Sequence, residues 1–194
     1  MMDDRTMTLR SARIILRELA LEDWPAVQAY ASRIEVCRYQ PWGPNTPEET
    51  RCFVVDAMAS AAEHPRRRYA LAVTLTPDGR VIGLAEMNVR DARSGSGEIS
   101  YVLHPDHWGQ GIATEAAGLL LRFGFAELGL HRIFATCDPR NVASARVMEK
   151  NGLQYEGRLR EALRIRDGWR DSLVYAILEP EWRAAVAGDI RPRE

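Results

Sequence analysis

The chain has 194 residues, 46% of them hydrophobic and 27% charged, and a formal net charge of −1 at pH 7. This composition predicts one ordinary soluble domain and excludes a global field that would draw the chain to nucleic acid or an acidic membrane. Three scattered cysteines without a Cys-x-x-Cys pair predict neither a disulfide framework nor a zinc ribbon. An acidic N-terminus without a signal-peptide core, and no run long enough to span a membrane, lead us to expect a cytoplasmic protein.

The first half of the chain predicts strands and helices of ordinary length. Thr46, Pro47 and Glu49 form an N-cap, a first-turn proline and a capping-box glutamate. The turn at 77–79 separates two alternating runs, which is typical of a hairpin. The expected elements are a strand at 9–19, a short helix from 21, a helix from 46 to about 63, and strands at 69–75 and 81–89.

The second half alternates strands with helices, which implies a parallel strand pair with a right-handed crossover. Gly152 is placed to end a short helix. The expected elements are a strand from 98 to 103, a helix at 113–125, a strand at 132–137, a short helix at 142–151, and an antiparallel pair at 153–159 and 169–178. We expect one domain over residues 1–180 and a charged, unassigned C-terminal tail over 181–194.

The stretch 104–117 has the features of an anion-binding loop. It joins a buried strand to the start of a helix, so free backbone N–H groups would face an anion at the positive end of the helix dipole. Gly109 and Gly111 allow close approach of a phosphate or pyrophosphate. A tight turn without a ligand is the alternative. The stretch matches neither the dinucleotide-binding pattern nor the P-loop pattern.

Residues Gly109-Gln-Gly-Ile-Ala113 resemble the pyrophosphate loop of the GNAT superfamily of acyl-CoA-dependent N-acetyltransferases, whose usual pattern is Arg/Gln-x-x-Gly-x-Gly/Ala. Trp108 stands at the first position, a departure that costs little because such a loop binds mainly through backbone groups. The Trp-Gly-x-Gly-Ile-Ala-Thr-Glu version is similar to the branch that acetylates the N-terminal alanine or serine of ribosomal proteins.

A second motif supports the resemblance. Residues 138–153 are similar to the family's Asn-x-x-Ala/Ser-x-x-x-Tyr-Glu-Lys-x-Gly-Phe. Asn141 has donors and an acceptor suited to the amides of a pantetheine arm. It can also cap the short helix that follows, and the two roles can coexist.

The resemblance, which covers about residues 9–178, implies a single α/β domain. We expect a mixed, mostly antiparallel sheet of about seven strands with flanking helices, in which the fourth and fifth strands are parallel and splay apart. The pantetheine arm would pair with the edge at 99–104. The implied acetyl-CoA contacts are Tyr101, Val102, Leu103, Trp108, Gly109, Gln110, Gly111, Ile112, Ala113, Thr114, Asn141 and Ser144.

The implied reaction is direct attack of an uncharged amine on a thioester, with the oxyanion held by a strand N–H near Val102. Met148 occupies the position of the family's usual tyrosine acid and cannot donate a proton. Ser144, one turn earlier, is our expected acid, unless its hydroxyl bonds only to its own helix. Glu98 is the first candidate base and Glu86 the second. Either could instead be a solvated carboxylate.

The acceptor stays open at this stage. A dedicated base is less necessary for an α-amine, whose pKa is about 7.7–8.0, than for lysine at about 10.4. We therefore expect a protein N-terminus. The alternatives are a small amine such as a polyamine, antibiotic or amino acid, and a non-catalytic acyl-CoA-binding module.

Three other features carry weaker expectations. His104 and His107 lack a third ligand, so no metal is expected. Residues 66–68 are a basic run that we expect to be a solvated strand end rather than a nucleic-acid contact. Trp42 could line the acceptor pocket or close the core. We expect a monomer or a homodimer, without membrane binding.

Overall fold

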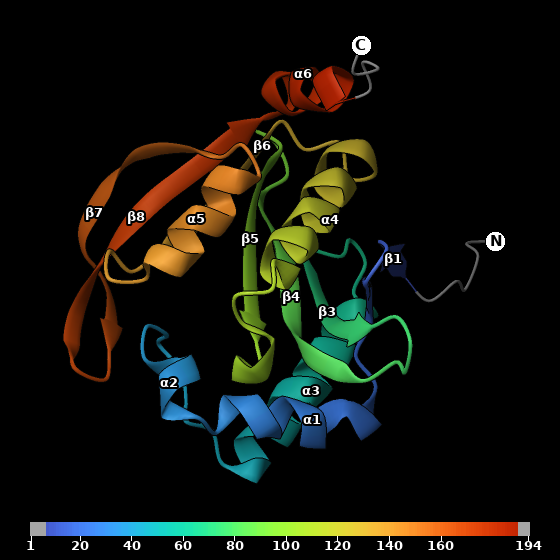
Figure 1. Ribbon diagram of the computed structural model, residues 1–194, viewed down its shortest axis with the longest axis vertical. Coiled ribbons are helices and arrows are strands. Elements are labelled where there is room, and N and C mark those ends of the chain that lie inside the picture. Colours follow the sequence, from blue (N-terminus) through green and yellow to red (C-terminus); the bar gives the residue numbers. More distant parts are fainter. Residues whose placement is uncertain (1–6, 190–194) are drawn as a thin grey trace.

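The computed structural model describes residues 7–189, which form a sheet of eight strands with helices on both faces (Figure 1). The spatial order of the strands is β1-β2-β3-β4-β5-β6-β8-β7. The strands are β1 (Thr8–Arg10), β2 (Ile14–Glu18), β3 (Arg68–Leu75), β4 (Val81–Asp91), β5 (Ser96–Leu103), β6 (Arg132–Cys137), β7 (Gln154–Ile165) and β8 (Gly168–Leu178). The α-helices are α1 (Trp24–Ala31), α2 (Ile34–Cys37), α3 (Pro47–Ala61), α4 (Ile112–Ala126), α5 (Val142–Lys150) and α6 (Glu179–Asp189), and the 3₁₀ helices are η1 (Leu21–Asp23) and η2 (Pro105–His107).

The α/β fold is confirmed, and the sheet has one strand more than the seven expected. The predicted strand at 9–19 is divided into β1 and β2, because a turn closes where the Ser11 N–H donates to the Ile14 carbonyl at 3.0 Å. The other antiparallel partners follow the predicted order, and β5 and β6 are the parallel pair.

Side chains that alternate between the two faces of the sheet form two hydrophobic cores, one on each face. One core packs under α4 and α5 and contains Ile99 and Ile133, both almost fully buried. The other packs under α1 and α3 and contains Ala72 and Leu84. Successive residues of a strand point to opposite faces, which is why the sequence can supply both cores from the same strands.

The splayed pair is the feature of the sheet that matters for function. Parallel pairing of β5 with β6 includes only 96–98 of β5, opposite 132–134 of β6. Beyond Glu98 the two strands separate, whereas β4 remains paired with β5 as far as Leu103. The edge of β5 that faces β6 is therefore without a strand partner over residues 99–103. This confirms the expected gap.

The C-terminal part differs from the sequence expectation. The β7–β8 hairpin is much longer than predicted, since β7 continues through a bulge to Ile165. Residues 179–189 form the helix α6, where the sequence had left a tail from 181. Trp182 packs against Phe125 of α4, with ring centroids 5.2 Å apart, so an aromatic contact attaches this helix to the domain. Among the described residues, no helix is both long and apolar enough to cross a membrane.

Candidate active site

The glycine loop leads into α4 with two residues in the left-handed region. Gly109 has a φ of 73° and Gly111, the N-cap, a φ of 77°. A Cβ at Gly109 would meet nothing within 4 Å, and one at Gly111 would lie 3.6 Å from an Arg13 nitrogen. Backbone conformation, rather than crowding inside the protein, therefore requires glycine here. Because no side chain caps α4, its first-turn N–H groups are available to an anion.

The first turn of α4 is fastened to the β1–β2 turn. Glu115 accepts hydrogen bonds from the Ser11 hydroxyl and from the Arg13 Nε at 2.7 Å. Arg13 also donates to the Gln110 carbonyl at 2.9 Å, and the Gln110 amide donates to the Asp106 carbonyl at 2.9 Å. Burial alone would raise the pKa of Glu115, but the bonds from Ser11 and Arg13 outweigh it and lower that pKa. The arginine thus balances the carboxylate beside the expected anion site. The sequence did not indicate this clamp.

Two hydrogen bonds define which peptide groups of β5 face the gap. The His104 N–H donates to a β4 carbonyl at 2.8 Å, whereas the Gly95 carbonyl accepts from the first residue of β6 at 3.1 Å. Peptide groups alternate sides along a strand. Even-numbered residues of β5 therefore direct their N–H groups toward β4, and Tyr101 and Leu103 direct theirs toward the gap. The expected donor near Val102 is displaced by one residue.

Trp108 closes the far end of this edge. Its indole N–H donates to the Leu103 carbonyl at 2.9 Å, although the side chain as a whole is about half exposed. The residue that departs from the family pattern thus fixes the end of β5 against the glycine loop. The Tyr101 peptide group is left as the central position of the free edge.

The serine expected to act as an acid lies beside a tyrosine from β5. The Ser144 hydroxyl is 3.1 Å from the Tyr101 hydroxyl, which also donates to the Ser144 carbonyl. Asn141 caps α5 by accepting from the Ser144 N–H at 3.2 Å, so the capping role is confirmed. Met148 is 1% exposed and has no proton to give. Burial raises the pKa of Tyr101 above its ordinary value, so the phenol is protonated across the working range.

Both candidate bases lie on the face of the sheet away from Ser144, and both are paired with arginines. Glu86 is 2.6 Å from Arg68, and Glu98 is 2.5 Å from Arg90. Glu98 sits where β5 and β6 still pair. Glu86 lies opposite Ser100, just beyond the point where the strands separate. The structure thus brings Glu86 nearer to the open part of the gap.

The expectations for the basic run at 66–68, for a metal site and for Trp42 have different outcomes. The predicted solvated strand end is wrong for Arg66 and Arg68, which pair with Glu18 and Glu86 and are mostly buried. Within residues 7–189, no three His, Cys, Asp or Glu side chains gather as a metal site would require. Trp42 is 36% exposed in its loop, and its role stays a prediction.

A glycine loop at a helix start, a strand pair that opens beside it and a hydroxyl pair at the opening define an acyl-CoA-dependent transferase. The family profile described as "Acetyltransferase (GNAT) domain" matches residues 13–154. The chain belongs to the GNAT family of acetyltransferases. It is 36% identical, over 91% of its length and 99% of the relative's, to the uncharacterized N-acetyltransferase YnaD of Bacillus subtilis (strain 168).

Solved structures agree with this assignment. A GNAT-family acetyltransferase from Bacillus anthracis superimposes with a TM-score of 0.79 at 34% identity, covering 90% of this chain and 99% of that one. The chain is therefore an N-acetyltransferase, and the alternative of a non-catalytic acyl-CoA-binding module is set aside.

Two more distant relatives carry acceptor names. The putative ribosomal N-acetyltransferase YdaF of Bacillus subtilis (strain 168) is 31% identical over 60% of this chain and 66% of its own length. The spermidine N(1)-acetyltransferase of Escherichia coli (strain K12) is 27% identical over 55% and 58%. The family relationship thus includes different amine acceptors.

Proposed function

We propose that this enzyme transfers an acetyl group from acetyl-CoA directly to the N-terminal α-amine of a protein or peptide, in the cytoplasm. The observation that supports direct transfer is the gap between β5 and β6, where the two strands separate beyond Glu98. Helices α4 and α5 lie on one face with the hydroxyl pair, and the two candidate bases lie on the other.

Acetyl-CoA fits the residues present. The uncapped first turn of α4, which begins at Ile112, suits a pyrophosphate, and Ala113 and Thr114 would contribute further N–H groups. The free β5 edge suits an arm that carries amides. Asn141 uses its side-chain oxygen for the helix cap and would contact the arm through the amide nitrogen. Acetyl-CoA supplies the acetyl group as a thioester.

In the proposed reaction the amine nitrogen forms a bond to the acetyl carbon and the carbon–sulfur bond breaks. The Ser144 hydroxyl, with Tyr101 beside it, donates a proton to the departing sulfur. The N–H of Tyr101 or Leu103, rather than that of Val102, stabilises the oxyanion. The ammonium proton of the acceptor passes to Glu86, or to Glu98, or to solvent.

The preference for an α-amine follows from the arrangement of the candidate bases. Each carboxylate is already in contact with an arginine, so neither stands free at the gap. Near neutral pH roughly 10% of an α-amine is already uncharged, against less than about 0.1% of a lysine amine. An acceptor that needs little deprotonation suits this site. The ribosomal name of one relative is in accord with this.

A small amine is the second candidate, because one relative is named for spermidine. The test is an acceptor screen with acetyl-CoA, in which peptides that start with different residues are compared with spermidine and other small amines. We expect mass spectrometry to find acetylation at the peptide N-terminus and none when that terminus is blocked. Acetyl-lysine on the blocked peptide, or faster turnover of spermidine, would refute the proposal.

A further inference from the structure

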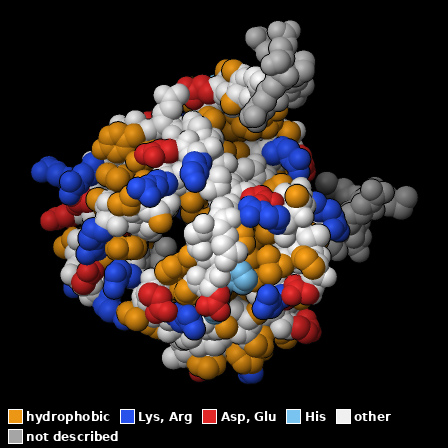
Figure 2. Space-filling model, in the orientation of Figure 1, with side chains coloured by type: hydrophobic (Ala, Val, Ile, Leu, Met, Phe, Trp, Pro, Cys, Tyr) orange, Lys and Arg blue, Asp and Glu red, His pale blue; other side chains and the backbone are white. Residues whose placement is uncertain are grey.

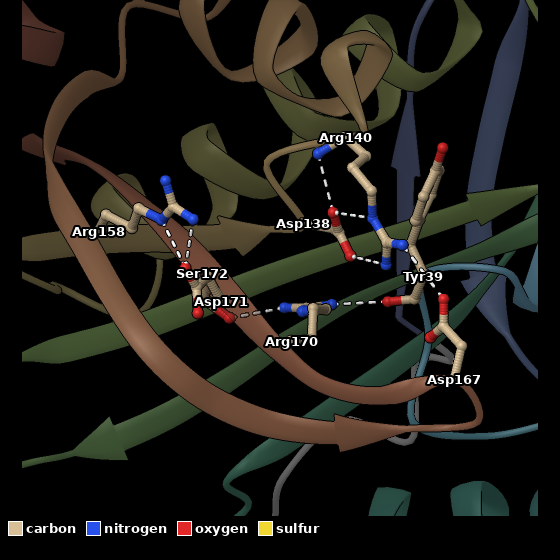
Figure 3. A network of polar contacts seen from close by, with 8 residues as sticks. All are labelled: Tyr39, Asp138, Arg140, Arg158, Asp167, Arg170, Asp171 and Ser172. Carbon is tan, nitrogen blue, oxygen red and sulfur yellow. Dashed lines mark hydrogen bonds and ion pairs between the residues drawn. The ribbon is translucent and has the colours of Figure 1, made fainter.

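A polar cavity lies between the β6–α5 turn and the long β7–β8 hairpin, and its volume is about 270 Å³. Figure 2 shows a hollow beside this hairpin, along which Lys and Arg side chains gather. Three aspartates and three arginines contribute to the wall, together with a proline and a tryptophan. Figure 3 shows all six of these charged side chains and their contacts. The sequence patterns indicated no role for any of these side chains.

Every aspartate of the wall already has an arginine. Both oxygens of Asp138 accept from Arg140, at 3.0 and 2.8 Å, and Asp167 accepts from the same guanidinium at 3.1 Å. Asp171 accepts from Arg158 at 2.6 Å. Each aspartate is therefore in contact with an arginine, although Asp138 and Asp167 share Arg140.

Arg170 is the arginine of the wall that pairs with none of these aspartates. It is 5% exposed and donates to the Tyr39 carbonyl at 2.6 Å and to the Ser172 hydroxyl at 2.8 Å. Its Nε has no hydrogen-bond partner, and none of the described carboxylates lies within ion-pair distance. Burial lowers the pKa of this guanidinium. The three aspartates of the wall equal its three arginines in number, and Asp138 offsets part of the cost of burying Arg170. Because two of the aspartates share Arg140, however, Arg170 is left buried without a direct ion pair, which is costly.

The cavity adjoins the predicted reaction site. Asp138 begins the turn that leads to Asn141, whose N–H donates back to the Asp138 carbonyl at 2.8 Å. The same turn starts the helix that presents Ser144. On the other side, Arg170 bonds to Tyr39 in the loop that also carries Trp42, a residue expected either to line the acceptor pocket or to close the core.

We propose that this cavity binds a carboxylate carried by the acceptor, with Arg170 as the specificity-determining residue. The inference rests on the proposed function and adds the chemical class of its substrate: an amine with an acidic group nearby. A guanidinium has five N–H donors in a planar fork that matches a carboxylate, and two protein acceptors are in contact with that of Arg170. A polyamine would instead have to compete with an arginine for each carboxylate of the wall.

The experiment compares acceptors that differ in a single charge. Tetrapeptide amides with N-terminal alanine carry Asp at the second, third or fourth position, and matched peptides carry Asn there. Free glutamate, its α-amide and spermidine distinguish a side-chain carboxylate from the α-carboxylate of a small acceptor. We expect kcat/KM to be about tenfold or more higher for the best Asp peptide, or for glutamate, than for its amide partner, which is the size of one charge-assisted contact.

The variants test whether Arg170 is responsible. Arg170→Gln should abolish the preference for the acidic acceptor and leave acetyl-CoA affinity unchanged, and Arg170→Lys should keep part of the preference. Arg132→Gln removes an arginine at the other end of β6 and should leave the preference intact. If Arg170 only supports the fold, Arg170→Gln will slow the acidic and amide acceptors equally.

The outcomes separate the two proposals. Equal turnover of Asp and Asn peptides by the wild-type enzyme would overturn the carboxylate site while leaving α-amine acetylation intact. Faster turnover of spermidine than of every peptide and of glutamate would refute both proposals. No acetylation of any peptide would refute the proposed function. The wild-type comparison needs no variant, so it is decisive even if Arg170→Gln does not fold.

Discussion

The Ser144 and Tyr101 hydroxyls, 3.1 Å apart, act on the same proton in the proposed reaction. Ser144→Ala should lower kcat by roughly ten- to a thousand-fold with little change in acetyl-CoA affinity, because general-acid help is worth about 10²–10⁴-fold. Tyr101→Phe should have an effect in the same direction, and the double variant should lose less than the product of the two effects. Pre-steady-state rates at saturating acetyl-CoA measure the chemical step.

The control for this pair is Ser60→Ala, which removes an exposed serine hydroxyl of α3 that bonds only to its own helix. It should leave kcat unchanged. Unchanged kcat in Ser144→Ala would show that the acid is another group, and a parallel loss of affinity would make Ser144 a binding residue.

Substitutions of Glu86 and Glu98 should differ in their effect on activity, because the two carboxylates lie at different distances from the gap. We expect Glu86→Gln to lower kcat/KM by about ten- to a hundred-fold below pH 7, whereas Glu98→Gln, where the strands still pair, should cost less than about threefold. The deficit of Glu86→Gln should shrink as the pH rises above the pKa of an α-amine, about 8, because the acceptor then needs no base. A pH profile of kcat/KM measures this. A larger loss of kcat/KM in Glu98→Gln than in Glu86→Gln would identify Glu98 as the base.

Residue identity predicted some of these roles and missed others. The capping role of Asn141 could be predicted from its place before a short helix, and the resemblance to the family motif implied that Met148 replaces the usual proton donor. The contact of Tyr101 with Ser144 could not, because the two residues are 43 positions apart and meet only after β5 and α5 pack. The isolation of Arg170 depends on which arginine each aspartate selects, and a linear pattern of charges does not specify that.

At the scale of elements, the β2–α1 junction depends on an ion pair that responds to pH. Arg17 donates two hydrogen bonds to Asp23, and the Ala20 N–H donates a third. Burial would raise the pKa of Asp23, but these bonds outweigh it and lower that pKa. The carboxylate therefore stabilises the fold above its unfolded pKa, near 3.9, and this contribution is lost as the pH falls through the lower native value.

Asp23→Asn should consequently reduce the free energy of unfolding at pH 7 by about 2 kcal/mol, a discounted value because Arg17 is 32% exposed. The difference from wild type should shrink as the pH falls below about 4. Urea unfolding at several pH values measures it. Asp78→Asn, which affects a surface pair at 3.6 Å, is the control and should cost less than about 0.5 kcal/mol. A difference that grows at low pH would contradict the assignment.

The glycine loop can be tested against a glycine of the same conformation elsewhere. Gly111→Val should weaken acetyl-CoA binding by more than about tenfold, because the side chain adds bulk at the anion site and strains a φ of 77°. Gly129→Ala, at a φ of 64° beyond the other end of α4 with nothing near its Cβ, carries the strain without touching the loop. It should bind normally. Calorimetric titration of both folded variants with acetyl-CoA measures the two affinities. Normal affinity in Gly111→Val would show that the loop is not part of the acetyl-CoA site.

Element boundaries show where sequence patterns succeed. The capping box at Thr46 and Glu49 is formed as predicted, since capping is a local interaction. The break between β1 and β2 and the length of β7 were missed. Each depends on a partner distant in sequence: Glu115 holds the β1–β2 turn, and β8 pairs with β7 through its bulge. Helix α6 was missed because one aromatic contact, Trp182 on Phe125, attaches a segment that looks polar.

For the molecule as a whole, the sheet separates two chemical surroundings. The glycine loop and the hydroxyl pair lie on the side of α4 and α5, whereas Glu86 and Arg170 are reached from the side of α1 and α2. In the proposed reaction, donor and acceptor meet at the gap between β5 and β6. The parallel strand pair was expected from the strand–helix–strand order, whereas the placement of Glu86 and Arg170 on the opposite face from the hydroxyl pair was not.

Because acetyl-CoA would contact the loop, the strand edge and α5 together, its binding should stabilise the entire domain. A ligand at about 100 times its Kd adds about 2.7 kcal/mol to the free energy of unfolding. For a domain of this size that corresponds to a rise in Tm of about 5–10 °C. Thermal unfolding with acetyl-CoA, and with pantetheine at the same concentration, measures it. Pantetheine lacks the pyrophosphate, so it should bind more weakly and raise Tm by much less. Equal shifts would show that the strand edge, and not the loop at Gly109 and Gly111, provides the affinity.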